Sequence, residues 1–147
     1  MAMTAPAGRR LGAAAIIRDE ARRILLVHHT YGNLNWELPG GLSEANESAS
    51  ATAIREVHEE TGLIVATGCL TGVYFDPEHD MHHFVFLCRS TASDLPRPSS
   101  PEISACLYWD PASLPRPISD FTIRRIEDAL KGADARLITI GPRRRIQ

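Results

Sequence analysis

The sequence contains few cysteines and almost no lysine, and its acidic and basic residues are nearly equal in number. Its 147 residues include three cysteines, Cys69, Cys88 and Cys106, an odd number without the spacing of a zinc site or a disulfide framework. Acidic residues outnumber basic ones by only 18 to 16, and Lys131 is the single lysine. Such a balance gives no field suited to nucleic acid or to an anionic membrane. We therefore expect neither as a partner.

Long hydrophobic runs are also missing. No stretch approaches the roughly 18 apolar residues that a membrane-spanning helix needs. Arg9 and Arg10 precede the apolar run from Leu11 to Ile17 in the manner of an export signal, but charged residues close that run without a small-residue cleavage site. The sequence thus predicts a cytoplasmic protein, in which the cysteines stay reduced and act as small apolar residues.

The remaining composition is that of an ordinary globular domain, with 44% hydrophobic and 23% charged residues. A chain of this length can build one hydrophobic core without disulfide or metal staples. We predict an N-terminal tail over residues 1–10, a single domain over residues 11–141 and a basic, solvated C-terminal tail over residues 142–147.

Two short apolar segments open this domain. Leu11–Arg18 and Ile24–His29 flank a charged turn, which predicts a hairpin-like pair of strands. Ser48 is a good N-cap for a helix over residues 49–61, and Gly62 is placed to end that helix. The helical residues that share the face expected to be buried are Ala53, Ile54, Val57 and Thr61.

Strand-like and helical patterns follow one another irregularly after Gly62. Strands are predicted over residues 63–75, 82–88, 103–109 and 137–140, with a turn over 112–114 and an amphipathic helix over 121–130. Because the two kinds of element do not strictly alternate, the pattern favours an α/β or α+β fold with a mixed sheet between helices.

Three glutamates on the first predicted helix carry the clearest chemical signal. Glu56, Glu59 and Glu60 stand at positions i, i+3 and i+4, so they share an arc of about 100° beside the buried face. Carboxylates at such short distances repel one another, and a divalent cation bound between them converts the repulsion into attraction. Mg²⁺ suits them because it takes hard oxygen ligands and binds substrate phosphates; the alternative is an ordinary solvated acidic helix.

Neighbouring residues fit a metal site at the same place. Arg55 lies one turn before Glu59 and can hold it through a charge-assisted bond, and Glu47 can reach back toward the same face. Gly40 and Gly41 would let the backbone approach a metal or a phosphate closely, since neither has a Cβ.

The spacing of the whole segment Gly41–Leu63 is more specific than the glutamates alone. It reads G-x5-E-x7-R-E-U-x-E-E-x-G-U, where U is apolar, and it resembles the signature of the Nudix hydrolases at every defined position. The preceding Trp36–Gly40 is similar to the lead-in common in that family. The resemblance implies a single-domain α/β/α sandwich with a mixed sheet. It also implies an enzyme that hydrolyses a nucleoside diphosphate linked to another moiety, by water attack on a pyrophosphate phosphorus.

The resemblance also implies roles for individual residues. Glu56, Glu59 and Glu60 would be the principal ligands of Mg²⁺, with Mn²⁺ as a substitute, and Gly41 would offer its carbonyl oxygen to the metal. Arg55 would orient the carboxylates, with Glu47 as a support for Arg55 and Gly40 beside it. The proton acceptor varies in the family, so the catalytic candidates are Glu56, Glu59, Arg55 and Glu102.

Glu102 stands outside the motif, just before the predicted strand 103–109. Enzymes similar to this one often place an extra metal ligand or base on a loop there, whereas a plain surface glutamate is the alternative.

The acidic and histidine-rich segment 76–83 allows a second metal site, a substrate loop or a solvated turn. His82 and His83 should point to opposite faces, because neighbouring strand residues do so.

Two substrate classes agree with this interpretation, nucleotide sugars such as ADP-ribose and nucleoside triphosphates, with no substrate-binding residue identified. A non-catalytic, regulatory nucleotide-binding module is the alternative from a different class, and the intact motif argues against it. A homodimer is expected only in so far as the family often dimerises.

Overall fold

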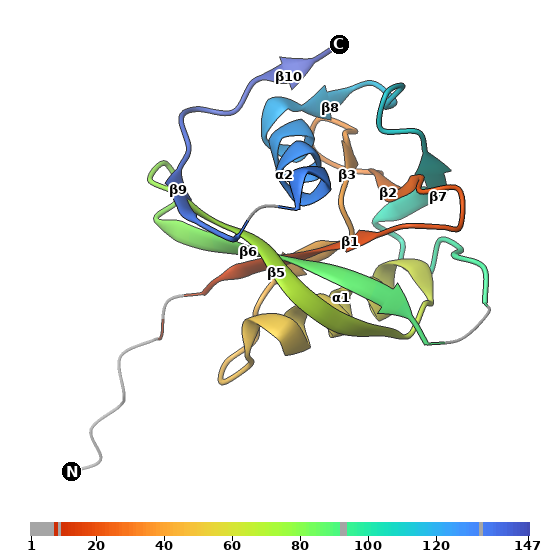
Figure 1. Ribbon diagram of the computed structural model, residues 1–147, viewed down its shortest axis with the longest axis horizontal. Coiled ribbons are helices and arrows are strands. Elements are labelled where there is room, and N and C mark those ends of the chain that lie inside the picture. Colours follow the sequence, from red (N-terminus) through yellow and green to blue (C-terminus); the bar gives the residue numbers. More distant parts are fainter. Residues whose placement is uncertain (1–7, 9, 92–93, 133) are drawn as a thin grey trace.

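The computed structural model describes residues 8, 10–91, 94–132 and 134–147, and Figure 1 shows their arrangement. Within these residues the chain forms two helices and ten strands. In chain order they are β1 Gly12–Ile17, β2 Ile24–His29, β3 Trp36–Glu37, β4 Gly40–Leu42, α1 Ala49–Thr61, β5 Val65–Asp76, β6 Met81–Ser90, β7 Ile103–Trp109, β8 Ile118–Ser119, α2 Asp120–Lys131, β9 Leu137–Thr139 and β10 Arg145–Ile146.

The strands form two mixed sheets rather than one. The first has the order β4-β1-β6-β5-β9 and the second β10-β8-β3-β2-β7. Parallel pairs, such as β1 with β6, stand beside antiparallel ones, such as β1 with β4. Helices α1 and α2 lie on opposite sides of the first sheet (Figure 1). The predicted α/β class and the layering of mixed sheets with helices are confirmed, and the division into two sheets is new.

Alternating residues of the inner strands build two separate core clusters. Ala14 and Ile16 of β1 pack in the cluster that contains Phe121 and Ile126 of α2. Their neighbours Ala15 and Ile17 pack in the cluster that contains Val57 of α1. Because strand side chains alternate between faces, a strand covered by a helix on each side must be apolar throughout, as β1 is.

The predicted hairpin of the first two apolar segments is wrong. Strand β1 belongs to the first sheet and β2 to the second, and the described bridge between them is the isolated pair Arg18 and Ile24. All six residues of β1 are buried, and β4 and β6 occupy its two edges. No edge of β1 is therefore left for β2, which pairs with β3 and β7.

Helix α1 has the bounds and the caps that the sequence predicts. The Ser48 hydroxyl accepts a hydrogen bond from the Ala51 amide at 3.1 Å. Gly62 ends the helix in the left-handed conformation, with φ of 76°, and its amide donates to the His58 carbonyl. Strand β7 also has its predicted bounds, and α2 is one residue longer at each end than predicted. The late strand is confirmed as β9.

The C-terminal segment is largely exposed, but it is also paired to the domain. Arg145 and Ile146 form β10, which pairs with β8, and the side chains of Arg143 and Arg144 contact acidic residues of the domain. Backbone pairing and ion pairs together hold these residues against the domain. Of the predicted tail over residues 1–10, only residues 8 and 10 lie within the described part.

Neither helix in the described part of the chain is long and apolar enough to cross a membrane.

Candidate active site

Glu60 connects helix α1 to strand β4. Its Oε1 accepts a hydrogen bond from the Gly40 amide at 2.7 Å, and the residue is only 6% exposed. Gly40 cannot be larger, because a Cβ there would strike the carbonyl oxygen of Ala13 in β1. The glycine therefore allows β4 to lie against β1, and this places the end of β4 at the carboxylate of Glu60.

Burial and neighbouring carboxylates disfavour negative charge at the buried end of this helix face. Burial is the largest cause that raises the pKa of Glu60, to about 8, and the charges of Glu56, Glu37 and Glu102 raise it further. Burial also raises the pKa of Glu56, although Arg55 opposes that change. A cation bound here would favour the charged form of both glutamates.

Arg55 joins the start of the motif to its end. Its Nε and Nη2 donate to the two carboxylate oxygens of Glu47, at 2.8 and 2.9 Å. Nη1 donates to Glu56 at 2.9 Å and to Glu59 at 3.2 Å. The hydrogen bond from Arg55 holds the pKa of Glu47 at about 2. The expected contact between Arg55 and Glu47 is present, and it fixes the guanidinium beside two of the helix carboxylates.

Gly41 and Glu56 lie in close contact. A Cβ at Gly41 would be 2.6 Å from the Glu56 carboxyl carbon and 2.8 Å from each of its oxygens. The missing side chain thus makes room for a carboxylate beside the backbone of β4. Glu59 differs from its two neighbours because its side chain is 52% exposed.

We expect Gly41→Ala to lower turnover without unfolding the protein. The added methyl group meets the end of a flexible side chain, so Glu56 must shift while the backbone stays in place. Gly141→Ala is the control, since a Cβ at that position meets nothing within 4 Å. Initial rates across a Mg²⁺ titration, with melting temperatures of both variants, measure the effect. Equal rates for both variants at limiting Mg²⁺ would show that the position of Glu56 is unimportant.

Glu102 lies near enough to the helix glutamates for its charge to act on them. The residue is exposed, and its carbonyl oxygen accepts a hydrogen bond from the Thr30 amide at 2.9 Å. The negative charge of its side chain contributes to the raised pKa of both Glu56 and Glu60. The fold therefore brings the loop before β7 within electrostatic reach of the motif.

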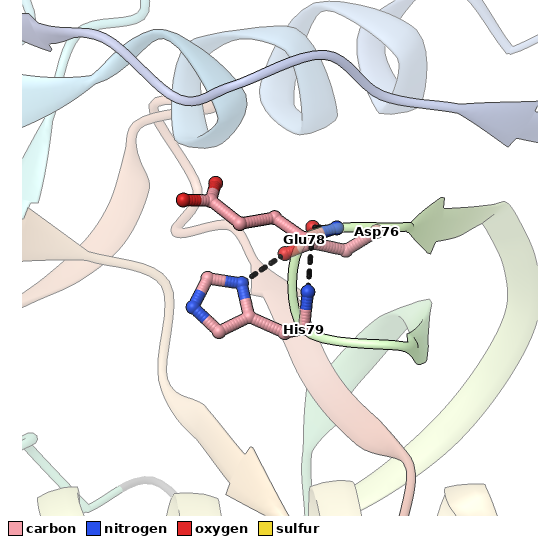
Figure 2. A group of neighbouring side chains, drawn as sticks. All are labelled: Asp76, Glu78 and His79. Atoms are coloured by element: carbon pink, nitrogen blue, oxygen red, sulfur yellow. Dashed lines mark hydrogen bonds and ion pairs between the residues drawn. The ribbon is translucent and has the colours of Figure 1, made fainter.

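The tightest group of metal-type ligand atoms in the described residues lies elsewhere, at the turn between β5 and β6. Ligand atoms of Asp76, Glu78 and His79 lie within 4.8 Å of one another (Figure 2). The buried carboxylate of Asp76 accepts hydrogen bonds from the Glu78 and His79 amides, and it contacts Nδ1 of His79 at 2.8 Å. It also accepts a bond from Arg143 at 3.0 Å. Because its oxygens already accept these bonds, Asp76 stabilises the turn between β5 and β6.

A cavity of about 160 Å³ adjoins the motif, and glycines of β4 form part of its wall. Its other walls include Glu37, which precedes the motif, and Arg125 of α2, whose Nη2 donates to Glu37 at 2.6 Å. Neither residue is predicted as part of a site by the sequence alone. Arg125 had a signal, however, because it shares the buried face of α2 with Phe121 and Ile126.

The two histidines at the end of β2 point apart, as expected for neighbouring strand residues. His28 stacks on Trp36 with ring centroids 4.6 Å apart, and its Nε2 bonds to the Leu34 carbonyl. His29 lines the cavity and stacks on Tyr31 at 4.7 Å. Burial lowers the pKa of His29, so its ring is neutral at pH 7.

Comparison with known proteins identifies the family. The NUDIX domain model matches residues 8–128. The chain is 35% identical over 121 residues to a MutT-like protein of Streptomyces ambofaciens, covering 82% of this chain and 76% of that one. It is 33% identical over 129 residues to a Bacillus subtilis (strain 168) protein provisionally named 8-oxo-dGTP diphosphatase, covering 88% and 85%.

Solved structures share the fold of this chain. An ADP-ribose pyrophosphatase from Streptococcus suis 89-1591 superposes with a TM-score of 0.69 at 23% identity, over 89% of this chain and 98% of that one. The likeness is one of fold, and it agrees with the single-domain sandwich expected from the motif. The family model and the two relatives confirm the resemblance of Gly41–Leu63 to the family signature, and the chain is a member of the Nudix hydrolase family.

Proposed function

We propose that this Nudix hydrolase cleaves the pyrophosphate bond of a nucleoside diphosphate derivative, with Mg²⁺ held by Glu56, Glu59 and Glu60. The observation that carries the proposal is the crowding of carboxylates at the junction of α1 and β4. Glu56 and Glu60 have raised pKa values there, and each lies against a glycine of β4. A site that resists negative charge in this way is stabilised by a divalent cation.

The donor set fits the metal. Carboxylate oxygens, joined by the carbonyl oxygen of Gly41, are the hard ligands that Mg²⁺ and Mn²⁺ prefer. Bound there, the metal would neutralise pyrophosphate charge and lower the pKa of the attacking water. Mn²⁺ is expected to replace Mg²⁺ in assays.

The chain's own residues then position the carboxylates and receive the proton. Arg55 orients Glu56 and Glu59, and Glu47 fixes Arg55 through two parallel hydrogen bonds. Either a glutamate of the motif or Glu102 accepts the proton of the attacking water, a role worth about 10²–10⁴-fold in rate.

The substrate belongs to one of two classes within this reaction, nucleoside triphosphates or nucleotide sugars such as ADP-ribose. The name of the Bacillus subtilis relative supports the first, and the cavity beside the motif offers room for the group attached to the pyrophosphate. A non-catalytic regulatory module is not favoured, because the motif is intact at every defined position. The three free cysteines fit a cytoplasmic location.

A panel of nucleotides tests the proposal. Nucleoside triphosphates, oxidised deoxynucleoside triphosphates and nucleotide sugars are incubated with the protein and Mg²⁺ or Mn²⁺, and the products are separated by chromatography. We expect a nucleoside monophosphate as one product, and no reaction in EDTA. The proposal would be contradicted if the protein cleaved none of these nucleotides in a metal-dependent reaction.

The variant Glu102→Gln shows whether Glu102 or a glutamate of the motif accepts the proton of the attacking water. If Glu102 is the base, turnover falls by about 10²–10⁴-fold while the Mg²⁺ requirement is unchanged. If Glu102 is a metal ligand, excess Mg²⁺ partly rescues the rate. Glu78→Gln is the control, an exposed glutamate on the turn between β5 and β6. A rate within about twofold of the wild type across the Mg²⁺ titration would remove Glu102 from the site.

A further inference from the structure

Three consecutive arginines fasten the C-terminal segment to three different elements. Arg143 contacts Asp76 at the turn between β5 and β6, at 3.0 Å. Arg144 lies 3.5 Å from Asp120 at the start of α2. Arg145 donates to the carbonyl oxygen of Asn33, between β2 and β3, at 2.7 Å. These residues form a clasp, and we call Arg143–Arg145 the arginine clasp.

The first arginine of the clasp lines the cavity beside the motif. Arg143 and Arg125 both line that cavity, and both guanidinium groups lie over the ring of Phe121, at 4.7 and 4.0 Å from its centroid. Arg144 is 82% exposed at its side chain and is not among the residues that line the cavity. Neighbours in the sequence therefore have very different surroundings.

Arg125 and Arg143 each have guanidinium N–H groups that are not used in the hydrogen bonds of the described residues. Arg143 uses the same nitrogen, Nη2, for its bonds to Asp76 and His83. Arg125 uses Nη2 for Glu37 and Thr122 and Nε for the Phe121 carbonyl, although the residue is only 5% exposed. Among the described residues, Nη1 of either arginine has no acceptor. These donors can therefore meet a ligand that carries acceptors, which replaces the bonds that they would otherwise make to water.

The charges around the cavity are already balanced. Glu37 compensates Arg125, and Asp76 compensates Arg143. Burial is the largest cause that lowers the pKa of His83, to about 4, so its ring is neutral at pH 7. A cavity with surplus donors but little net charge suits a neutral, planar group with several acceptors better than it suits a further phosphate.

We propose that Arg143 is a specificity-determining residue that contacts the nucleobase of the substrate. The inference rests on the proposed function, because the motif is taken to hold the pyrophosphate. Gly41 of the motif and Gly40, which is bonded to Glu60, both form part of the cavity wall, so a pyrophosphate at the metal and a base near Arg143 lie on one continuous surface. Arginine donates well to the carbonyl and ring-nitrogen acceptors of a base edge, and it stacks on planar groups.

The test compares Arg143→Ala with Arg144→Ala, on nucleotides that differ only in the base. We expect the first variant to raise KM for the preferred nucleotide by about 10- to 100-fold, with kcat nearly unchanged. It should also reduce the discrimination between the best and the worst base by about tenfold. Arg144→Ala should keep both values within about twofold of the wild type.

A second variant and a binding assay distinguish the loss of a base contact from the loss of the folded structure. Arg143→Gln retains an amide that can donate to Asp76, and it should show the same loss of discrimination. Titration with a non-hydrolysable analogue of the preferred nucleotide should show the same fall in affinity as the KM values, without depending on catalysis.

The outcomes separate the two claims. If the wild type cleaves no nucleotide, the proposed function fails. If the wild type cleaves nucleotides but Arg143→Ala and Arg144→Ala behave alike, only the role of Arg143 fails. A fall in kcat with unchanged KM and unchanged base discrimination would also overturn that role.

Discussion

Glu60→Gln is expected to lower turnover by more than about 100-fold while leaving the fold intact. Loss of a residue that merely supports a metal ligand costs about 10–100-fold, so loss of a charged ligand should cost more. Glutamine keeps a carbonyl oxygen that can accept the bond from the Gly40 amide. Steady-state rates at limiting Mg²⁺ and a melting curve measure the two parts of the prediction. Near wild-type turnover under those conditions would show that Glu60 is not a ligand.

The same variant should change how stability depends on pH in metal-free protein. The pKa of Glu60 rises from its ordinary 4.5 to about 8 on folding, so the folded protein keeps a proton that the unfolded chain releases. The free energy of unfolding should therefore fall as pH rises from about 4.5 to about 8, by on the order of a few kcal/mol. Urea denaturation in EDTA at pH 5 and pH 8.5 should show this fall in the wild type and a smaller one in Glu60→Gln. Equal falls in the two proteins would refute the burial argument.

Arg55→Lys is the second change with a large expected effect. Lysine keeps the charge but loses the planar fork that reaches both oxygens of Glu47 and, from the other side, Glu56 and Glu59. We expect turnover to fall by about 10–100-fold and the Mg²⁺ requirement to rise, because the carboxylates lose their common support.

Arg124→Lys is the matched control for this change. Arg124, whose side chain is 50% exposed, pairs with Asp128 one turn further along α2. Its replacement should leave the rate and the Mg²⁺ requirement unchanged. If Arg55→Lys were kinetically as silent as this control, Arg55 would be a surface residue without a role in the site.

Local signals were enough to predict helix α1 and the arrangement of its glutamates. Ser48 and Gly62 determine where the helix begins and ends through bonds to residues three or four positions away. The spacing of Glu56, Glu59 and Glu60 places them on one side of the helix in any protein, because it follows from helix geometry. Their difference in burial could not be predicted in the same way. Glu60 is buried because Gly40, twenty residues earlier, brings β4 against it.

The errors in prediction come from contacts between distant parts of the chain. The apolar pattern of β1 indicates a strand, but it does not say that β4 and β6 take both of its edges. The clasp was missed for the same reason, since Arg143 meets Asp76 across 67 residues of sequence. Arg125 and Glu37 are 88 residues apart, and only the fold shows that they form one wall of the cavity. A basic run or a lone glutamate carries no local sign of such a partner.

Binding of Mn²⁺ to the nucleotide-free protein tests the central claim most directly, and electron paramagnetic resonance counts free and bound ions. The account predicts that the wild type binds Mn²⁺ and that Mg²⁺ displaces it. Glu56→Gln and Glu60→Gln should weaken binding by at least about tenfold, whereas Glu78→Gln, at the turn between β5 and β6, should not change it. Undiminished binding by Glu56→Gln and Glu60→Gln, or loss of binding in Glu78→Gln instead, would contradict a metal site on helix α1.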